Sequence, residues 1–257
     1  MKKYSVFSLI KNALSKHQDW DVAWRDPEPK KEYDAIIIGG GGHGLATAYY
    51  LAKEYEIKNI AILEKGWIGG GNIGRNTTIL RSNYMHDANN LFYDHGMQMW
   101  KGLSQELNYN VMYSPRGILN LAHSDAQLNA YSRRGNSMRL NGIEASLLGR
   151  EEVRKIIPFA DFTDNARFPI FGGLMQSIGG TARHDAVAWG YARAADDLGV
   201  DIIQHCEVTG FDIVNGSVQG VHTSRGFIKT NKIGLCVAGS TSIPVSYTHL
   251  TLPTRAV

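Results

Sequence analysis

The stretch Asp34–Gly44, DAIIIGGGGHG, joins an apolar strand to a helix through a run of glycines. The strand is predicted over Ala35–Ile38, a short β-branched run of the kind found in parallel strands that are buried on both faces. Gly39, Gly41 and Gly44 then follow the G-x-G-x-x-G spacing. In that motif the first glycine permits a tight turn, the second lets the backbone approach a pyrophosphate, and the third lets the helix pack closely on the strand. The stretch therefore predicts a dinucleotide-binding unit.

The residues after the turn complete this prediction. A helix is expected over Leu45–Lys53, with its N-terminal N–H groups directed at the phosphates. A second strand, Ile60–Leu63, ends in Glu64, 20 residues after Gly44, where a carboxylate can accept hydrogen bonds from both ribose hydroxyls. An acidic residue there disfavours the 2′-phosphate of NADP. The turn itself is compatible with FAD and with NAD. The neighbouring candidates for contacts with the nucleotide are Gly42, His43 and Lys65.

A second glycine cluster follows in Gly69–Arg81, GGGNIGRNTTILR. Its backbone can approach a flat ring system, and its polar side chains can satisfy the edges of that ring. An ordinary surface loop is the alternative explanation. The candidates for contacts with the cofactor are Gly71, Asn72, Arg75, Asn76 and Thr77.

Several long segments then carry a resemblance to a known family. They are YSVFSLIKNAL at Tyr4–Leu14, the stretch Pro27–Glu54 around the glycine turn, LEKGWIGGGNIGRNTTILRSNY at Leu63–Tyr84, RGILNLAH at Arg116–His123, and Gly179–Phe211. With these, the chain resembles the flavin-dependent amine oxidases of the D-amino-acid oxidase and sarcosine oxidase superfamily. More narrowly, it resembles the β subunits of heterotetrameric sarcosine oxidases, from about Met1 to Ser242.

The resemblance implies an α/β fold: a Rossmann-like FAD-binding domain of the D-amino-acid oxidase type, interleaved with a partial α+β substrate domain. It implies a noncovalent FAD bound by the Gly39–Gly44 turn and Glu64. Further FAD contacts are expected from Val208, Ala238 and Gly239. It also implies a second flavin, FMN, attached covalently to His184.

From the residues alone, His184 and the following Asp185 resemble a helix cap. A neutral imidazole is nevertheless a nucleophile near neutral pH, which suits it to anchor a flavin. The amphipathic helix expected over Asp185–Leu198 could also place its N-terminus near a flavin phosphate, although the charge of Asp185 opposes this.

Arg81 and Thr78 are the candidates for residues near the reaction. Arg81 is suited to supply positive charge beside a reduced flavin or to orient a substrate carboxylate, and a surface salt bridge explains it equally well. The resemblance implies oxidative demethylation of sarcosine to glycine, with electrons passed from FAD to FMN and then to O2, giving H2O2. It also implies partner α, γ and δ subunits that bind NAD and tetrahydrofolate. An NAD-dependent dehydrogenase and a non-catalytic nucleotide-binding fragment are the alternatives.

The composition excludes other classes. The chain has 257 residues, 43% of them hydrophobic, and a net charge of +3, which is too small and dispersed to indicate nucleic-acid binding. Cys206 and Cys236 fit free thiols of a cytoplasmic protein better than a disulfide. No segment is long enough to span a membrane. The basic and apolar start lacks a signal-peptide cleavage site, so residues 1–32 are expected to form a helical extension that packs on the domain or on a partner.

The order of elements predicts the domains. An FAD-binding domain is expected over 33–84 and 180–242, and the partial substrate domain over 85–179. Residues 243–257 fit no periodic pattern and resemble translated adapter sequence, so they are expected to be non-native, with a genuine polar extension as the alternative. The other elements expected are helices at Ala88–Leu107 (anchored by Leu91, Met99, Trp100 and Leu103), Asp125–Leu140 and Arg150–Ile157, a strand at Ile118–Leu121, a meander of strands Val200–His205, Glu207–Val214, Ser217–Ser224 and Gly226–Lys229, and a buried strand at Lys232–Ala238.

Overall fold

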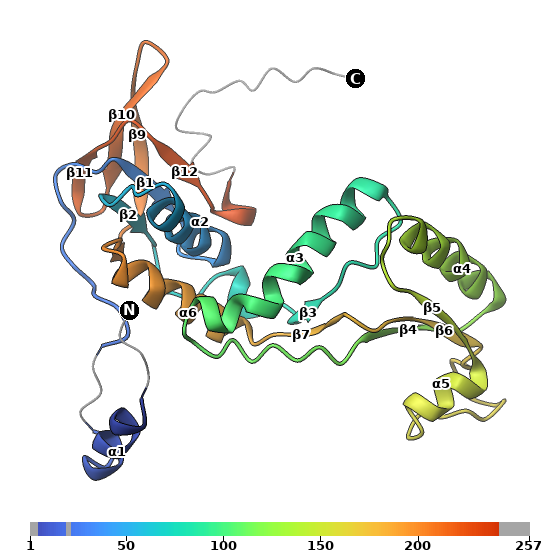
Figure 1. The fold of residues 1–257 in the computed structure, drawn as a ribbon. Helices are drawn as coiled ribbons and strands as arrows, with labels where there is room; N and C mark the ends of the chain where they lie inside the picture. Colours follow the sequence, from blue (N-terminus) through green and yellow to red (C-terminus); the bar gives the residue numbers. More distant parts are fainter. Residues whose placement is uncertain (1–4, 19–21, 242–257) are drawn as a thin grey trace. The chain divides into compact units, whose positions relative to one another are not determined.

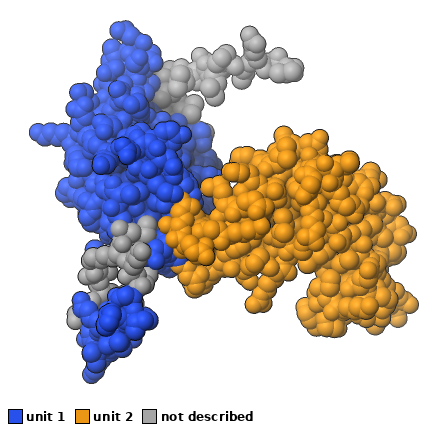
Figure 2. Space-filling view, in the orientation of Figure 1, with its two compact units in different colours: residues 1–76, 107–109, 184–257 blue, residues 77–106, 110–183 orange. Residues whose placement is uncertain are grey.

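The computed structural model describes residues 5–18 and 22–241 (Figure 1). The expected non-native tail, 243–257, lies outside the described residues. The chain divides into two compact units (Figure 2): unit 1 is Met1–Asn76, Leu107–Tyr109 and His184–Val257, and unit 2 is Thr77–Glu106 and Asn110–Arg183. Both domain boundaries expected from the sequence, after residue 84 and before residue 180, fall inside unit 2. The reason is a strand pair, β3 (Ile79–Leu80) with β7 (Gly180–Thr181), that joins the two ends of this unit.

Unit 1 is built on a parallel four-stranded sheet in the order β12-β1-β2-β8. The central strands β1 (Ala35–Ile38) and β2 (Ile60–Leu63) are buried at every position, as their β-branched runs predict. The outer strands are β12 (Ile233–Leu235) and β8 (Asp201–Ile203).

Two expectations for these outer strands were wrong. Strand β8 was assigned to the meander, yet it pairs parallel with β2, a long-range contact that local pattern does not reveal. The strand expected over Lys232–Ala238 is shorter and is not fully buried, because β12 lies at the edge of the described sheet and Leu235 is 45% exposed.

Helices α2 (Gly42–Glu54) and α6 (His184–Asp197) lie side by side and pack on this sheet (Figure 1). Their buried residues are mostly small, which allows this close approach: Gly44, Ala48 and Ala52 from α2, with Ala188, Ala192 and Ala195 among those from α6. Both helices begin earlier than expected. Helix α2 starts at Gly42, so the glycine motif runs into its first turn, and His184 is the first residue of α6 instead of preceding it.

The remaining strands of unit 1 form an antiparallel sheet of β9 (Val208–Val214), β10 (Ser217–Thr223) and β11 (Gly226–Lys229). The N-terminal extension is only partly helical. Helix α1 (Val6–Leu14) buries no residue, and the segment from Arg25 to Tyr33 is an arm fixed by ion pairs. None of the helices in the described ranges combines the length and apolar character that a membrane crossing requires.

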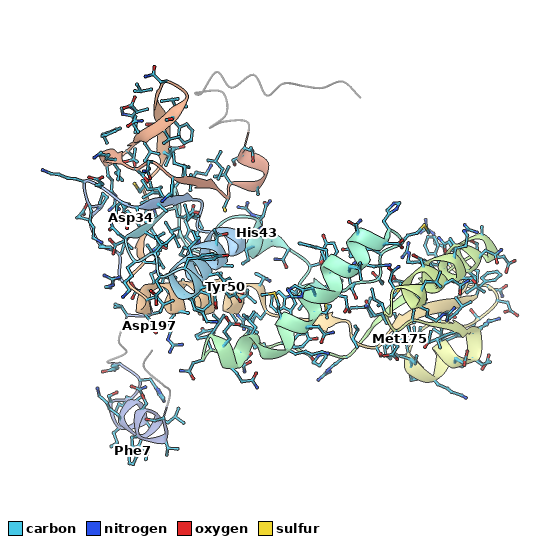
Figure 3. All side chains as sticks on the ribbon, turned by 45° about the horizontal axis from the view of Figure 1, so that its top comes forward. Phe7, Asp34, His43, Tyr50, Met175 and Asp197 are labelled. Carbon is cyan, nitrogen blue, oxygen red and sulfur yellow. The ribbon has the colours of Figure 1, made fainter. Side chains whose placement is uncertain are left out.

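Unit 2 contains an antiparallel sheet in the order β4-β6-β5, formed by Ile118–Ala122, Gly172–Gln176 and Ser146–Gly149. Helices α4 (Asp125–Leu140) and α5 (Arg150–Ile156) pack against it. Met175 of β6 is labelled in Figure 3.

The long helix of unit 2, α3 (Asp87–Glu106), buries Asn90, Met97 and Leu103. Of the expected apolar anchors, Leu103 is buried, whereas Leu91 is 60% exposed and Met99 is 43% exposed. The expectation for these two was wrong because they lie on a different face of the helix from Met97.

A buried polar cluster fixes the N-terminal arm to the sheet. The Tyr33 hydroxyl accepts a hydrogen bond from the backbone N–H of Lys30 (3.0 Å) and donates one to Asp201 (3.1 Å). Lys30 also forms an ion pair with Asp201 (2.7 Å), and Arg25 forms one with Asp196 (2.7 Å). Burial, together with the negative charge of Asp201, raises the pKa of Tyr33 to about 12.

This raised pKa predicts a specific dependence of stability on pH. Because the folded pKa lies above the ordinary value near 10, Tyr33 stabilises the fold fully below pH 10, and this contribution is lost as the pH rises toward 12. Denaturant unfolding from pH 9 to 12 should therefore show a smaller fall in the unfolding free energy for Tyr33→Phe than for the unmodified chain. Tyr55→Phe is the control, because Tyr55 is 73% exposed. An identical slope for Tyr33→Phe and the unmodified chain would refute the assignment.

Candidate nucleotide-binding site

Two glycines of the turn between β1 and α2, Gly39 and Gly44, admit no side chain. Gly39 has φ +105°, and a Cβ there would lie 2.5 Å from the carbonyl oxygen of Cys236. A Cβ at Gly44 would lie 1.9 Å from the carbonyl oxygen of Gly39. These are contacts with backbone, which cannot move aside as a flexible side chain can. Only glycine therefore fits at both positions.

Gly41 differs from its neighbours because no atom lies within 4 Å of the place where its Cβ would be. It is the N-cap of α2, and the first hydrogen bond of the helix runs from the Leu45 N–H to its carbonyl (3.0 Å). The N–H groups of Gly42 to Gly44 have no intrahelical acceptor, because they belong to the first turn. The exposed His43 lies on the same turn (Figure 3). Open space in front of free N–H groups at a helix N-terminus suits a phosphate.

Glu64 ties two turns together at the end of β2. Its Oε2 accepts a hydrogen bond from the Gly40 N–H (2.7 Å), and its Oε1 accepts one from the Gly66 N–H (2.8 Å). The sequence did not reveal this structural role. Each carboxylate oxygen has a second lone pair, so both remain able to accept a hydrogen bond from a ribose hydroxyl. Glu64 is half-buried and the adjacent Lys65 is exposed.

The second glycine cluster folds against the first. Its centre is the short 3-10 helix η1 (Asn72–Arg75), and a Cβ at Gly42 would lie 2.9 Å from the Ile73 side chain. Gly71 has open space where a Cβ would be. Asn72, Arg75, Asn76 and Thr77 are exposed, and the Asn76 amide donates to the Ile73 carbonyl (2.8 Å). This loop is thus an ordered part of the site in unit 1, except for Thr77, which begins unit 2.

A third segment reaches the same end of the sheet after β12. The Cys236 N–H donates to the Ile38 carbonyl (2.8 Å), which holds Cys236 beside the glycine turn. Burial raises the pKa of the Cys236 thiol. Ala238 has φ +47° and starts the 3-10 helix η2 (Ala238–Ser240), and Gly239 faces open space. Ligands of open α/β sheets bind at the carboxyl ends of the strands, where these segments meet.

Val208 lies elsewhere in unit 1, at the start of β9. It is partly buried and packs on the core cluster that contains Tyr33, Ile36 and Cys206. Its side chain is thus part of the core, and any contact with a cofactor would come from its backbone.

His184 occupies the first position of α6. Its ring Nδ1 is buried and has no hydrogen-bond partner among the described residues. Asp185 is the second residue of α6 and accepts a hydrogen bond from the N–H of the next residue, Ala186 (2.8 Å), so this is not an N-cap bond, which reaches two or three residues ahead. An unpaired buried polar atom is costly, so the position of this ring is not explained by its own hydrogen bonds.

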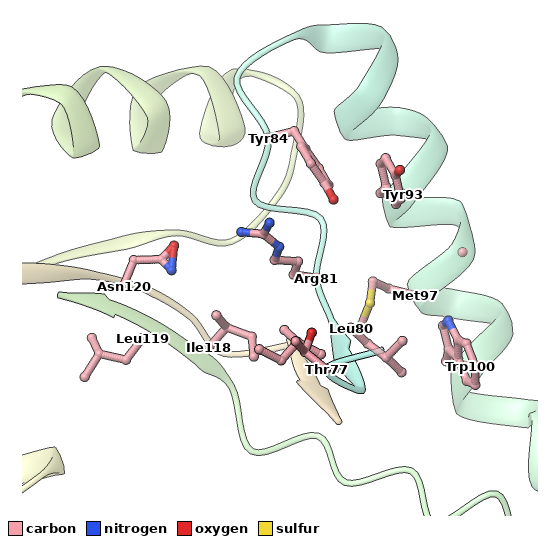
Figure 4. A pocket seen from close by; sticks show the side chains of 12 residues that line it. Thr77, Leu80, Arg81, Tyr84, Tyr93, Met97, Trp100, Ile118, Leu119 and Asn120 are labelled. Atoms are coloured by element: carbon pink, nitrogen blue, oxygen red, sulfur yellow. The ribbon is translucent and has the colours of Figure 1, made fainter. Parts of the chain in front are cut away.

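Arg81 and Thr78 lie in unit 2. Arg81 lines a pocket of about 550 Å³ formed by residues of β3, α3 and β4 (Figure 4). The centre of its guanidinium is 5.5 Å from the ring centroid of Tyr84, and Tyr84 stacks on Tyr93 with centroids 4.3 Å apart. No acidic side chain in the described part of the chain pairs with Arg81, so the surface salt bridge considered from the sequence is not formed there. Tyr93 was not singled out from the sequence, because the pocket residues come together only in the fold.

Thr78 adopts an unusual backbone conformation next to this pocket. Its φ is +63°, which is rare for a β-branched residue, and its carbonyl accepts a hydrogen bond from the Ala182 N–H (3.1 Å). Strained residues of this kind cluster at functional sites.

Two known proteins that are similar to this chain carry the same name. The chain is 61% identical to a protein named sarcosine oxidase subunit beta from Rhizobium meliloti, over 98% of this chain and 60% of that protein. A protein of the same name from Rhodobacter capsulatus is 49% identical over 100% of this chain and 62% of that protein. The chain therefore spans about three fifths of the length of these relatives.

Solved structures show the same fold. L-proline dehydrogenase from P. horikoshii superposes with a TM-score of 0.79 at 24% identity, covering 87% of this chain and 57% of that one. Glycine oxidase from Bacillus cereus gives a TM-score of 0.73 at 24% identity, covering 84% of this chain and 58% of that one. The family model described as "FAD dependent oxidoreductase" matches residues 34–256. The chain accordingly belongs to the DAO family of FAD-dependent oxidoreductases.

Proposed function

We propose that this chain is the FAD-binding part of a sarcosine oxidase β subunit and acts in the oxidative demethylation of sarcosine to glycine. The observation that carries the proposal is the open space at Gly41, beside the free N–H groups at the start of α2. The identity of 61% to a sarcosine oxidase subunit beta supports the choice of substrate. Membership of an FAD-dependent family favours FAD over NAD at this turn.

The residues of unit 1 bind and orient the cofactor in this proposal. The N–H groups of Gly42 to Gly44 hold the pyrophosphate, and Glu64 accepts the ribose hydroxyls. The glycines and asparagines of the η1 loop, with Ala238 and Gly239, surround the rest of the molecule. When bound, FAD supplies the acceptor for the two electrons removed from the substrate.

Arg81 binds the carboxylate of the amino-acid substrate in this proposal. A guanidinium recognises a carboxylate with two parallel hydrogen bonds, and Arg81 has no acidic partner among the described residues that would compete. The lining of the pocket also includes the apolar and aromatic side chains of Leu80, Met97 and Trp100.

The proposal also includes a second flavin and partner subunits. His184 is the attachment point of a covalent FMN, which agrees with its buried and unpaired ring nitrogen. Bound there, FMN would supply a second electron acceptor, which O2 would reoxidise to give H2O2. The partners are α, γ and δ subunits, which carry NAD and tetrahydrofolate. The use of "subunit beta" in the names of the relatives supports a multi-subunit protein.

A side chain at Gly41 should abolish FAD binding. Gly41 has φ −80°, so Gly41→Val is compatible with the backbone and fills the space reserved for the phosphate. We expect the purified variant to fold, by circular dichroism, and to retain no FAD. Gly102→Val is the matched control, because that glycine in α3 also faces open space. Full FAD retention by Gly41→Val would sink the assignment of the turn.

Removal of His184 should eliminate the covalent flavin while FAD remains. His184→Ala leaves the glycine turn intact, so only flavin fluorescence that survives denaturing electrophoresis should disappear. His222→Ala is the control, because His222 lies on β10 and packs against Phe227. A denatured His184→Ala chain that still carries flavin would place the attachment elsewhere.

The substrate assignment is tested by anaerobic addition of sarcosine to the flavin-loaded chain. We expect loss of the oxidised flavin absorbance. The sarcosine concentration that gives the half-maximal rate should rise about 10- to 100-fold in Arg81→Leu, since hydrogen bonds to charged groups contribute about 1.5–3 kcal/mol. The exposed Arg133→Leu serves as control. Flavin that stays oxidised in the unmodified chain would contradict the proposed function.

A further inference from the structure

The segment that follows β3 contains Arg81, Ser82 and Asn83, and it turns there, because the Tyr84 N–H donates a hydrogen bond to the Ser82 carbonyl (2.9 Å). Figure 4 shows the Arg81 side chain between Asn120 and Tyr84 at the pocket. Ser82, which lies between Arg81 and Asn83 in the sequence, is fully buried. The orientation of Arg81 thus depends on what holds Ser82 and Asn83.

Ser82 is held by a reciprocal pair of hydrogen bonds with Gln176, the last residue of β6. The Ser82 N–H donates to Gln176 Oε1 (3.2 Å), and Gln176 Nε2 donates to Ser82 Oγ (2.6 Å). Both residues have 0% exposure. A satisfied polar pair of this kind, buried between segments distant in the sequence, fixes the backbone beneath Arg81.

Asn83 connects Arg81 to strand β4 of the sheet in unit 2. Arg81 Nη1 donates to Asn83 Oδ1 (3.4 Å), and Asn83 Nδ2 donates to Asn120 Oδ1 (2.9 Å). Asn83 is only 2% exposed, whereas Arg81 is exposed. Asn120 belongs to β4 and lines the pocket. The guanidinium is therefore connected to the rigid sheet through two amides.

We infer that Asn83 and Asn120 are positioning residues, which orient the Arg81 guanidinium for the carboxylate of a small amino acid. The inference rests on the proposed function, in which Arg81 binds that carboxylate. Its physical basis is the neutrality of the amide partners. A carboxylate in place of Asn83 would orient Arg81 equally well but would neutralise it and compete with the ligand. An amide oxygen accepts one N–H and leaves the full positive charge, and the other N–H groups, for the substrate.

Binding of a carboxylate can be followed without turnover, because Trp100 lines the same pocket. The probe is sarcosine, compared with N-methylglycinamide, which lacks the carboxylate charge. Tryptophan fluorescence of the full chain is titrated with each probe, and Trp100→Phe identifies the responding residue. We expect sarcosine to bind more tightly than the amide, with this preference lost in Arg81→Ala.

Asn83→Ala should weaken sarcosine binding about 3- to 10-fold, the range of one typical intramolecular hydrogen bond. Asn83→Asp, which keeps the size of the side chain, should weaken it at least as much, because the new charge pairs with Arg81. Asn89→Ala, on the exposed side of α3, should have no effect. In an Arg81→Ala background, Asn83→Ala should change binding less than about twofold, since Asn83 acts only through Arg81.

The outcomes separate the two claims. If Arg81→Ala leaves sarcosine binding unchanged, the proposed role of Arg81 fails. If Arg81→Ala weakens binding while Asn83→Ala and Asn83→Asp both bind as the unmodified chain does, the positioning role is wrong and the proposed function stands. An equal loss from Asn83→Ala with and without Arg81 would show a merely structural role. Thermal unfolding of each variant is measured alongside, and Asn120→Ser supplies a milder change at the far end of the connection.

Discussion

The contact between the Gly39 carbonyl and the α carbon of Gly44 is the constraint on which unit 1 depends. A Cβ at Gly44 would approach that oxygen to 1.9 Å, so the first turn of α2 lies directly against the end of β1. This contact fixes the first turn of α2, with its free N–H groups, next to the open space at Gly41. Glu64 then fixes the turn from the side, by accepting the Gly40 N–H. In the proposed function, nucleotide recognition is thus a consequence of backbone packing, with side chains in supporting roles.

The site in unit 1 gathers segments that are remote in sequence. The η1 loop packs its Ile73 side chain near Gly42, and Cys236 holds the last segment against the end of β1. Each of these contacts meets a glycine position where a larger residue would collide. Several glycines of the two clusters, such as Gly39 and Gly42, therefore allow three loops to approach one another at the carboxyl end of a parallel sheet, whereas Gly41 and Gly71 face open space.

Local patterns were sufficient for much of this fold. Strands β1 and β2 were predicted at their observed residues, because each is a β-branched run bounded by turn residues. The predictions failed for elements whose place in the fold depends on contacts between residues distant in the sequence. Strand β8 pairs with β2 across more than a hundred residues of sequence, and the buried face of α3 is centred on Met97 instead of Met99.

In the candidate site, too, local sequence patterns predicted some features, and others depend on contacts between distant segments. The glycine spacing and the position of Glu64 were evident in the sequence, but the hydrogen bond from Gly40 was not, because it requires the folded turn. Arg81 was identified as a candidate, yet its neutral partners Asn83 and Asn120 come from two different segments and carry no local signal. A spacing motif locates a cofactor, whereas the orientation of a charged group depends on tertiary hydrogen bonds.

The central claim is that the Gly39–Gly44 turn binds FAD. The most direct measurement is titration of the flavin-free chain with FAD, followed by flavin fluorescence, in the presence and absence of excess NAD. We expect saturable binding of one FAD at this turn, unaffected by NAD. Displacement of FAD by NAD, or no FAD binding by a folded chain, would contradict it.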